Sequence, residues 1–193
     1  MRSFVVIIIL ATVISMAHAE FSINVGIGGG HMAFAQTESE VNIDSNHHFY
    51  GGLHFEKQII GRLYGGINLD YYLFKAKLNK EYDEQFYCNS FTKHSISIPL
   101  ELSLKKGPFS LYGGFGLFTI IASETEFISQ DGYLPSSSHV DKETQITTEF
   151  TAGLRVKPEK SVFLSFRVTS VQEIEQDFND VFWTLSLGCV LEQ

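Results

Sequence analysis

Cysteine is scarce in this chain of 193 residues, which contains only Cys88 and Cys189. Two cysteines cannot supply the dense disulfide framework of a small exported domain, so the fold has to depend on burial and backbone pairing. The topology that we predict below puts the two residues near opposite ends of the molecule. A disulfide requires Cα atoms about 4.4–6.8 Å apart, so we predict no bridge between them.

Basic residues are also few. The chain has 14 Lys and Arg against 22 Asp and Glu, which gives a formal net charge of −8. This balance opposes binding to a phosphate backbone, so we expect no nucleic-acid partner. His47, His48 and His54 do not have the spacing of metal ligands, because adjacent residues of a strand point to opposite faces. We predict no metal and no cofactor.

Long apolar runs are almost absent, and the exception is Phe4 to Ile14. This run follows Arg2 and precedes Ala17-His18-Ala19, the arrangement of a secretory signal peptide with its cleavage site. It is too short for a membrane helix, which needs about 20 apolar residues. We predict a Sec-type signal peptide over residues 1–19 and a single domain over residues 20–193.

Alternation of apolar and polar residues dominates the rest of the chain. It is clearest from His94 to Ser123, where two long runs flank the turn Lys106-Gly107-Pro108. A period of two is a property of β-strands. These runs exceed the usual strand of roughly 5–6 residues and suit a bilayer, which about 9–11 tilted residues cross. One apolar row of the first run is formed by Ile96, Ile98, Leu100, Leu102 and Leu104.

Eight such strands can be predicted along the chain. Short turns alternate with long polar segments between them, which is typical of outer-membrane barrels. We therefore predict an all-β fold, an eight-stranded antiparallel up-and-down transmembrane β-barrel in the outer membrane of a Gram-negative cell envelope. The predicted strands are 21–35, 47–58, 62–75, the two strands of 94–123, 144–157, 161–170 and 181–191, and the predicted long loops are 36–46, 76–91, 124–143 and 171–180.

Alternation does not establish which face of the strands points outward. A soluble periplasmic lipocalin-like barrel, with its apolar row inside around an apolar ligand, is the alternative. The membrane arrangement is favoured because the polar row is rich in Gly, Ser and Thr, and small residues fit the interior of an eight-stranded barrel. We predict a monomer whose apolar row contacts outer-membrane lipid. The candidates for aromatic girdles near the strand ends are Phe21, Tyr71, Phe109 and Trp183.

The predicted inward row carries charges of both signs. Buried charges have to be paired, so we hypothesise an ion-pair network that plugs the lumen, with an ion path or a catalytic site as the alternative. The predicted members are Glu56, Arg62, Asp70, Glu101, Glu149, Arg155 and Arg167. Pro99 lies in the middle of a predicted strand, where it removes a ladder hydrogen bond, so we expect a bulge or an unpaired carbonyl beside it.

The central hairpin contains Ile98-Pro99-Leu100, then the turn Gly107-Pro108, then Tyr112-Gly113-Gly114. This pattern resembles that of the PorT-like outer-membrane β-barrel domain family. The resemblance implies the barrel fold and implies no particular activity.

Three functions remain open. The first, which we predict, is a structural or surface-interaction role whose partner is undefined, with acidic loops such as Thr37–Asp44 and Glu173–Asp180 on the outside. The second is a porin-like pore, which the narrow interior of eight strands disfavours. The third is a lipid-modifying enzyme. Its candidates are His94 with Ser95 or Ser97, and His31. His94 and Ser95 point to opposite faces of a strand and no acidic partner at suitable spacing stands out, so we expect no catalytic residues.

Overall fold

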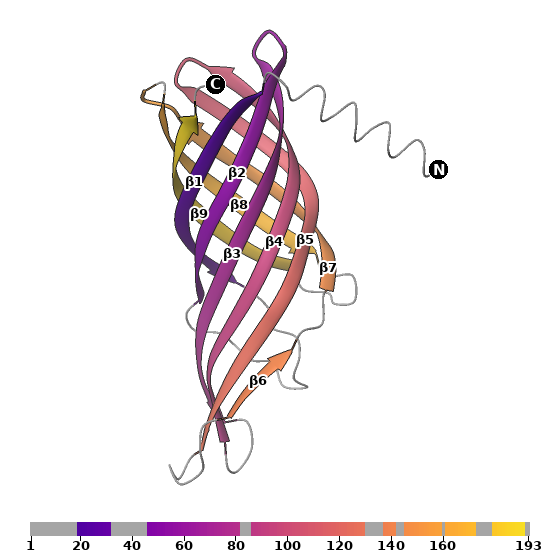
Figure 1. The fold of residues 1–193 in the computed structure, drawn as a ribbon, viewed down its shortest axis with the longest axis vertical. Coiled ribbons are helices and arrows are strands. Elements are labelled where there is room, and N and C mark those ends of the chain that lie inside the picture. Colours follow the sequence, from indigo (N-terminus) through magenta and orange to yellow (C-terminus); the bar gives the residue numbers. More distant parts are fainter. Residues whose placement is uncertain are drawn as a thin grey trace, which may run out of the picture.

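Eight β-strands close into a barrel, and a ninth short strand lies beyond one end of it (Figure 1). The computed structural model describes residues 19–31, 46–81, 86–129, 137–141, 145–159, 161–172 and 179–191. None of these segments forms a helix long and apolar enough to cross a membrane. The strands are β1 (Glu20–His31), β2 (Asn46–Ile60), β3 (Leu63–Glu81), β4 (Phe86–Lys106), β5 (Phe109–Ser129), β6 (Ser137–Asp141), β7 (Gln145–Val156), β8 (Val162–Gln172) and β9 (Asn179–Leu191).

The barrel is antiparallel throughout and closes between its first and last strands. Its order is β1-β2-β3-β4-β5-β7-β8-β9, and β9 pairs back onto β1 from Phe21↔Leu191 to His31↔Val181. Closure leaves no unpaired edge within the barrel wall, which a lipid environment requires. The predicted eight-stranded up-and-down barrel is therefore confirmed.

Two-residue turns join β2 to β3 and β4 to β5 at one end of the barrel, the short-turn end. Gly61 and Gly107 are the first residues of these turns and have φ angles of 56° and 61°. Glycine at this position with positive φ is the requirement of a type II′ hairpin turn, whose twist matches that of the flanking strands. Arg62 is the second turn residue and is exposed. The prediction that Arg62 begins a strand and points into the lumen is wrong, because β3 begins one residue later.

The apolar row of every barrel strand faces outward. Leu111 of β5 is 64 % exposed and Val25 of β1 is 61 % exposed, whereas their neighbours Ser110 and Asn24 are buried. An apolar band around the outside of a closed barrel is the surface that a bilayer covers. The lipocalin-like alternative required the opposite arrangement, so the burial pattern excludes it.

Pro99 is accommodated without a bulge. The β3–β4 ladder pairs Ile67 with Leu100 and Asp70 with Ser97, and it omits the two intervening positions with no shift of register. Proline has no backbone N–H to donate, so this gap is the expected result of placing it in the wall. The sequence analysis expected either a bulge or an unpaired carbonyl beside Pro99, and the structure shows a break in the ladder without a bulge.

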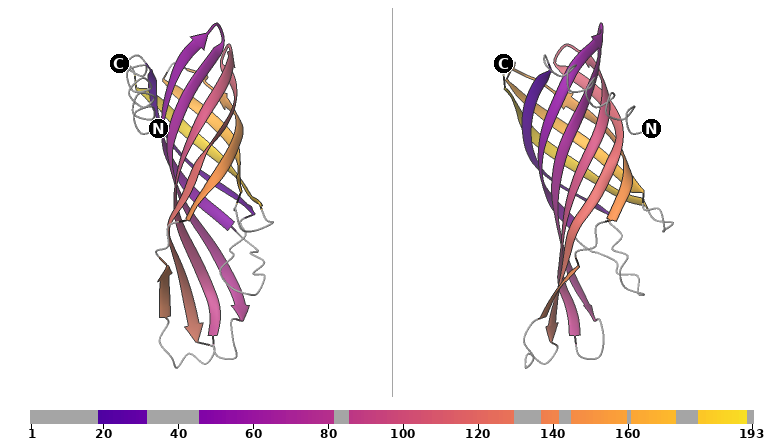
Figure 2. Two further views of the ribbon diagram at one scale, coloured as in Figure 1. Left: turned by 90° about the vertical axis from the view of Figure 1, so that its right-hand side faces the viewer. Right: turned by 45° about the vertical axis from the view of Figure 1, so that its right-hand side comes forward.

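Beyond the barrel rim, at the end opposite the short turns, four strands continue as an open sheet (Figure 2). It consists of β6 and the ends of β3, β4 and β5, over residues 76–81, 86–92 and 123–129, and we call it the projecting sheet. The predicted loops 76–91 and 124–143 are therefore wrong over these residues. Beyond the rim no lumen separates an inner from an outer face, so the alternation that marks the barrel wall is not required there. The predicted loop residues 36–45 and 173–178, and the signal peptide apart from Ala19, lie outside the described residues.

Candidate functional site

The middle of the lumen is organised around Arg167, an inward residue of β8 that is 4 % exposed. Its Nη1 donates to Asp70 Oδ2 at 2.5 Å and its Nη2 donates to Glu101 Oε1 at 2.9 Å. The hydroxyl of Tyr72 lies 3.3 Å from Nη1, and the hydroxyl of Tyr50 donates to Asp70 Oδ1 at 2.7 Å. One guanidinium thus joins β3, β4 and β8 across the barrel through charge-assisted hydrogen bonds.

Arg155 of β7 lies nearer the short-turn end and is held more loosely. Its guanidinium nitrogens lie 3.8 Å from a carboxylate oxygen of Glu56 and 3.7 Å from one of Glu101. Its Nε and Nη2 have no hydrogen-bond partner among the described residues. Glu56 is also bound by the ammonium of Lys105 and by the hydroxyl of Ser103, at 2.6 Å for the latter.

The remaining predicted members of the network differ in position. Glu149 of β7 is fully buried and accepts a hydrogen bond from the hydroxyl of Ser97 on β4. Arg62 lies in the exposed turn, away from this cluster. Lys105 of β4 also binds Glu56, although the predicted network does not include it. We call the set of Glu56, Asp70, Glu101, Lys105, Arg155 and Arg167 the lumen cluster.

Glycine makes room for these side chains on the inner wall. A Cβ at Gly52 would lie 2.3 Å from Asp70 Oδ1 and 2.5 Å from the hydroxyl of Tyr50. A Cβ at Gly153 would lie 2.5 Å from the ring of Tyr112. Such distances are far below van der Waals contact. The lumen of eight strands therefore holds its large polar side chains only because the neighbouring positions are glycines, which have no side chain.

An aromatic cluster fills the lumen at the end nearer the projecting sheet. Tyr72 is in ring contact with Phe74, Phe118 and Phe182, at centroid distances of 5.3–6.0 Å. His48 packs against the same rings, and its Nε2 lies 2.9 Å from the hydroxyl of Thr184. The sequence analysis named none of these as site residues, although their parity along the strands puts them on the inward row. They close one end of the lumen with apolar surface.

The predicted girdle residues lie on the outer surface toward both ends. Tyr71, Phe109 and Trp183 are exposed. Phe21 is half-buried and packs on Phe55 with ring centroids 4.8 Å apart. The hydroxyl of Tyr71 lies 2.7 Å from Nδ1 of His94, so this histidine also belongs to the outer surface. Their contact with the membrane interface stays a prediction.

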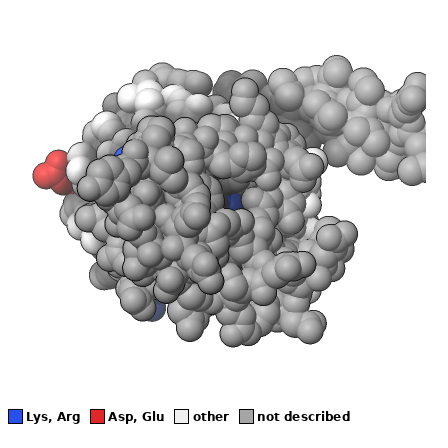
Figure 3. Space-filling model, turned by 90° about the horizontal axis from the view of Figure 1, so that it is seen from below, with Lys and Arg blue, Asp and Glu red and all other residues white. Residues whose placement is uncertain are grey.

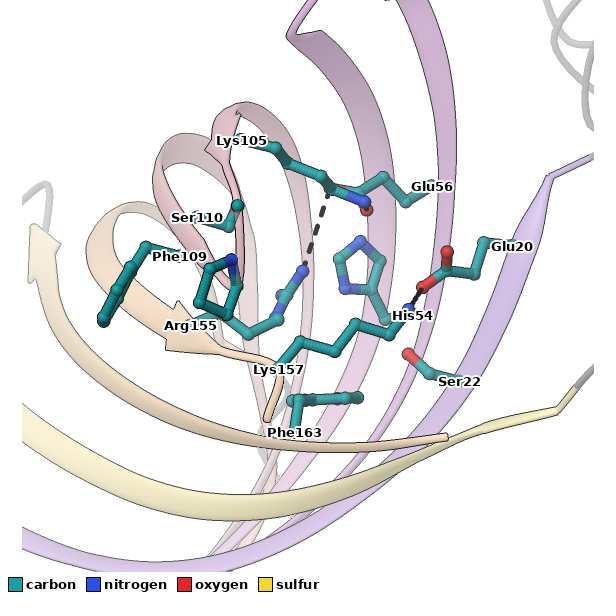
Figure 4. Close-up of a pocket in the computed structure, with 12 residues that line it drawn as sticks. Glu20, Ser22, His54, Glu56, Lys105, Phe109, Ser110, Arg155, Lys157 and Phe163 are labelled. Carbon is teal, nitrogen blue, oxygen red and sulfur yellow. Dashed lines mark hydrogen bonds and ion pairs between the residues drawn. The ribbon is translucent and has the colours of Figure 1, made fainter. Parts of the chain in front are cut away.

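A cavity of about 40 Å³ lies in the lumen at the short-turn end (Figure 4). It is lined by side chains of Glu20, Ser22, His54, Glu56, Lys105, Phe109, Ser110, Arg155, Lys157 and Phe163, together with Gly107 and Pro108. Viewed from the opposite end, the described charged side chains show at only a few places (Figure 3). The aromatic cluster lies at one end of the lumen, and the charged groups around the small cavity lie at the other.

No group of three or more His, Cys, Asp and Glu side chains suited to a metal ion occurs among the described residues. Cys189 is a free, exposed thiol near the short-turn end. Cys88 belongs to β4 in the projecting sheet, at the opposite end of the molecule.

No protein-family model matches the chain, and no curated protein matches it in sequence. Solved structures match it in fold. The Ail attachment invasion locus protein of Yersinia pestis, crystallised with the heparin analogue sucrose octasulfate, superposes with a TM-score of 0.54 at 15% identity, over 90% of this chain and 99% of that one.

Two further solved structures match the fold at low sequence identity. OprG from Pseudomonas aeruginosa gives a TM-score of 0.53 at 11% identity, over 91% of this chain and 97% of that one. Neisserial surface protein A gives 0.50 at 15% identity, over 90% and 97%. The chain has the fold of the small outer-membrane β-barrels, which confirms the predicted fold class.

Proposed function

We propose that this protein is an outer-membrane β-barrel with a structural and surface-interaction role, carried by the projecting sheet. The observation behind the proposal is that β3, β4 and β5 run past the barrel rim and gain β6 as a fourth strand. A strand that only crosses the membrane needs about 9–11 residues, whereas β4 and β5 have 21 each. The extra length forms a sheet outside the bilayer.

The projecting sheet has the features of a contact surface. Beyond Ala76, β3 pairs on one side only, and β6 pairs only with β5, among the residues that the structure describes. Such edges present backbone N–H and C=O groups to any extended segment that approaches. Among the described residues, the short-turn end has no comparable extension. We propose that the projecting sheet lies outside the cell and that the short turns lie in the periplasm.

The lumen supports a role other than transport. The lumen cluster crosses the middle of the barrel and the aromatic cluster fills one end. The interior of eight strands has room only for side chains, and we propose that these side chains plug it. Some hydroxyl groups of the described lumen do meet a possible base, as Ser97 meets Glu149 and Thr184 meets His48. These pairs are almost completely buried, which leaves no room for a substrate beside them, so we propose no enzymatic role.

Charge limits the kind of partner. Residues 32–45 contain three acidic and no basic residues, and residues 173–178 contain three acidic and no basic residues. Acidic segments of this kind would repel a polyanion such as the heparin analogue with which Ail was crystallised. We propose a neutral or basic protein surface as the partner. Within the barrel class, we propose the PorT-like family for this chain, and we propose that residues 1–19 are removed as the signal peptide.

The test is to remove the projecting sheet and keep the barrel. Residues 77–90 and 124–142 are replaced by short Gly-Ser turns, which leaves the Ala76↔Phe91 and Ile120↔Gln145 pairs in place. The shortened chain should still show the mobility shift of a closed barrel between unheated and boiled gel samples. Cells that express it should lose adherence to surfaces coated with basic protein and crosslinks to neighbouring proteins.

The full-length chain and a chain with only the turn Gly61-Arg62 replaced serve as controls, since that turn lies at the opposite end. Equal adherence of the shortened and full-length chains would refute the surface role. Conductance of the full-length protein in planar bilayers would refute the plug and favour a pore.

A further inference from the structure

We infer that the cavity at the short-turn end binds a small oxyanion of the phosphate type from the periplasmic side. The binding of the anion does not depend on the proposed surface role, whereas the assignment of this end to the periplasm rests on the orientation proposed above. It arises from the donor groups that line the cavity and that the lumen cluster leaves unused.

Three buried polar groups point to a ligand. Arg155 is 7 % exposed, and its Nε and Nη2 lack hydrogen-bond partners among the described residues. The same holds for Nε2 of His54, which is 2 % exposed, and for Oγ of Ser110, which is 5 % exposed. All three line the one cavity (Figure 4). Buried polar groups nearly always have partners, so three unused groups around one space mark a place where a polar guest is accommodated.

The charge of the lining favours an anion over a cation. Lys105, Lys157 and Arg155 contribute three positive charges, and Glu20 and Glu56 contribute two negative ones. Glu56 is occupied by Lys105, and Glu20 by Lys157 at 2.7 Å. The two lining carboxylates are thus each bound by a lysine. The guanidinium of Arg155 lies 3.7–3.8 Å from Glu56 and from Glu101, beyond hydrogen-bond distance, so its Nε and Nη2 still have N–H groups to donate.

The chemistry of the free donors selects an oxyanion. A guanidinium offers parallel N–H groups that match two oxygens of a phosphate or carboxylate. The hydroxyl of Ser110 supplies a further donor, and the ring of His54 supplies another in its Nε2–H tautomer. The cavity of about 40 Å³ has the space of about three water molecules, which also suits one small oxyanion.

The described residues that line the cavity place it at one mouth of the barrel. The lining includes the exposed residues Gly107 and Pro108 of the β4–β5 turn, so the cavity lies at the mouth of the barrel. At the other end of the lumen the aromatic cluster around Tyr72 blocks the axis. The anion therefore enters and leaves through the periplasmic mouth and does not pass through the barrel.

The test is calorimetric titration of the purified full-length chain with inorganic phosphate, in an uncharged detergent and at fixed ionic strength against chloride. We expect one saturable site with a Kd of about 1 mM or tighter. Ser110→Ala removes one hydrogen bond to a charged group and should weaken binding about tenfold. Arg155→Lys keeps the charge but removes the parallel N–H groups of the guanidinium, and it should weaken binding by at least as much.

Arg62→Lys is the matched control, because Arg62 is an arginine at the same end that does not line the cavity. It should bind phosphate as the unaltered chain does. Heat-dependent gel mobility establishes that each variant is folded, and Ser110→Ala keeps the test decisive if the Arg155 variant does not fold.

A second titration includes a short-chain phosphatidylglycerol in the micelles. Displacement of inorganic phosphate by this lipid would assign the site to a headgroup phosphate, and no displacement would assign it to a free anion. The inference is overturned if no saturable binding occurs, or if Ser110→Ala leaves the affinity unchanged.

Discussion

Replacing Arg167 with Met should destabilise the barrel more than any other single change in the lumen cluster. The methionine keeps much of the volume of the side chain and removes its charge. It leaves the carboxylates of Asp70 and Glu101 buried without the donors that lie 2.5 Å and 2.9 Å away. Removing one partner of a buried ion pair costs about 3–5 kcal/mol, because the remaining charge is uncompensated.

Arg155→Met provides the internal comparison, since it changes the same residue type in the same lumen. The guanidinium of Arg155 lies 3.7–3.8 Å from its carboxylates and beside a cavity. Glu56 keeps Lys105 and Ser103 as partners when Arg155 is lost, and Glu101 keeps Arg167 and Asn68. We expect a loss of about 1–2 kcal/mol in the free energy of unfolding.

The chain carries its own reporter for the measurement. Trp183 is the single tryptophan and lies on the outward row of β9. Its fluorescence follows denaturant-induced unfolding of the refolded barrel in lipid vesicles, and the midpoint and slope give the free energy. A double variant, Arg167→Met with Asp70→Asn, should recover part of the lost free energy of unfolding, because it removes one of the two carboxylate charges left without a partner.

The outcome that refutes this reasoning is specific. If Arg167→Met costs less than about 1 kcal/mol, the two short contacts contribute no more than a surface pair does. If Arg155→Met is less stable than Arg167→Met, the shorter nitrogen–oxygen distances at Arg167 do not mark the stronger ion pairs. A double variant less stable than Arg167→Met alone would show that Asp70 is stabilised by groups other than the guanidinium.

Three other predictions concern the wall and the two ends. Gly153→Ala should cost about 1–3 kcal/mol by overpacking, whereas Gly113→Ala, where a Cβ meets only one atom at 3.6 Å, should be nearly neutral in the same unfolding assay. Brominated lipid should quench the fluorescence of Trp183 more strongly than a water-soluble quencher does. On intact cells, a membrane-impermeant maleimide should label Cys88 and spare Cys189; labelling of Cys189 alone would show that the short-turn end faces outward.

The sequence predicted the barrel wall well and the projecting sheet poorly, for the same reason. Alternation reports one face in an apolar environment and one face in a polar one. It therefore identifies the part of β4 that belongs to the barrel wall and fails at Phe86–Thr92, which lie beyond the barrel rim in the projecting sheet. Arg62 was misplaced for a related reason, because parity along a strand assigns a face only to residues that belong to the strand.

The lumen combines two kinds of filling that composition alone does not distinguish. Charged residues meet around Arg167 in the middle, and aromatic rings meet around Tyr72 toward the projecting sheet. Both kinds lie on the inward row, so both could be predicted as interior. Their separation into layers arises from the stagger of the strands around the barrel.

The sequence by itself determined the eight strands of the barrel wall, the turn at Gly107 and which side chains of a strand share a face. These are local properties, since a period of two and a two-residue turn need only neighbouring residues. Only the tertiary structure decided which inward side chains meet. Arg167 bonds to Asp70 and Glu101, 97 and 66 residues away along the chain. Register and closure set the height of each residue in the barrel, and alternation carries no information about height.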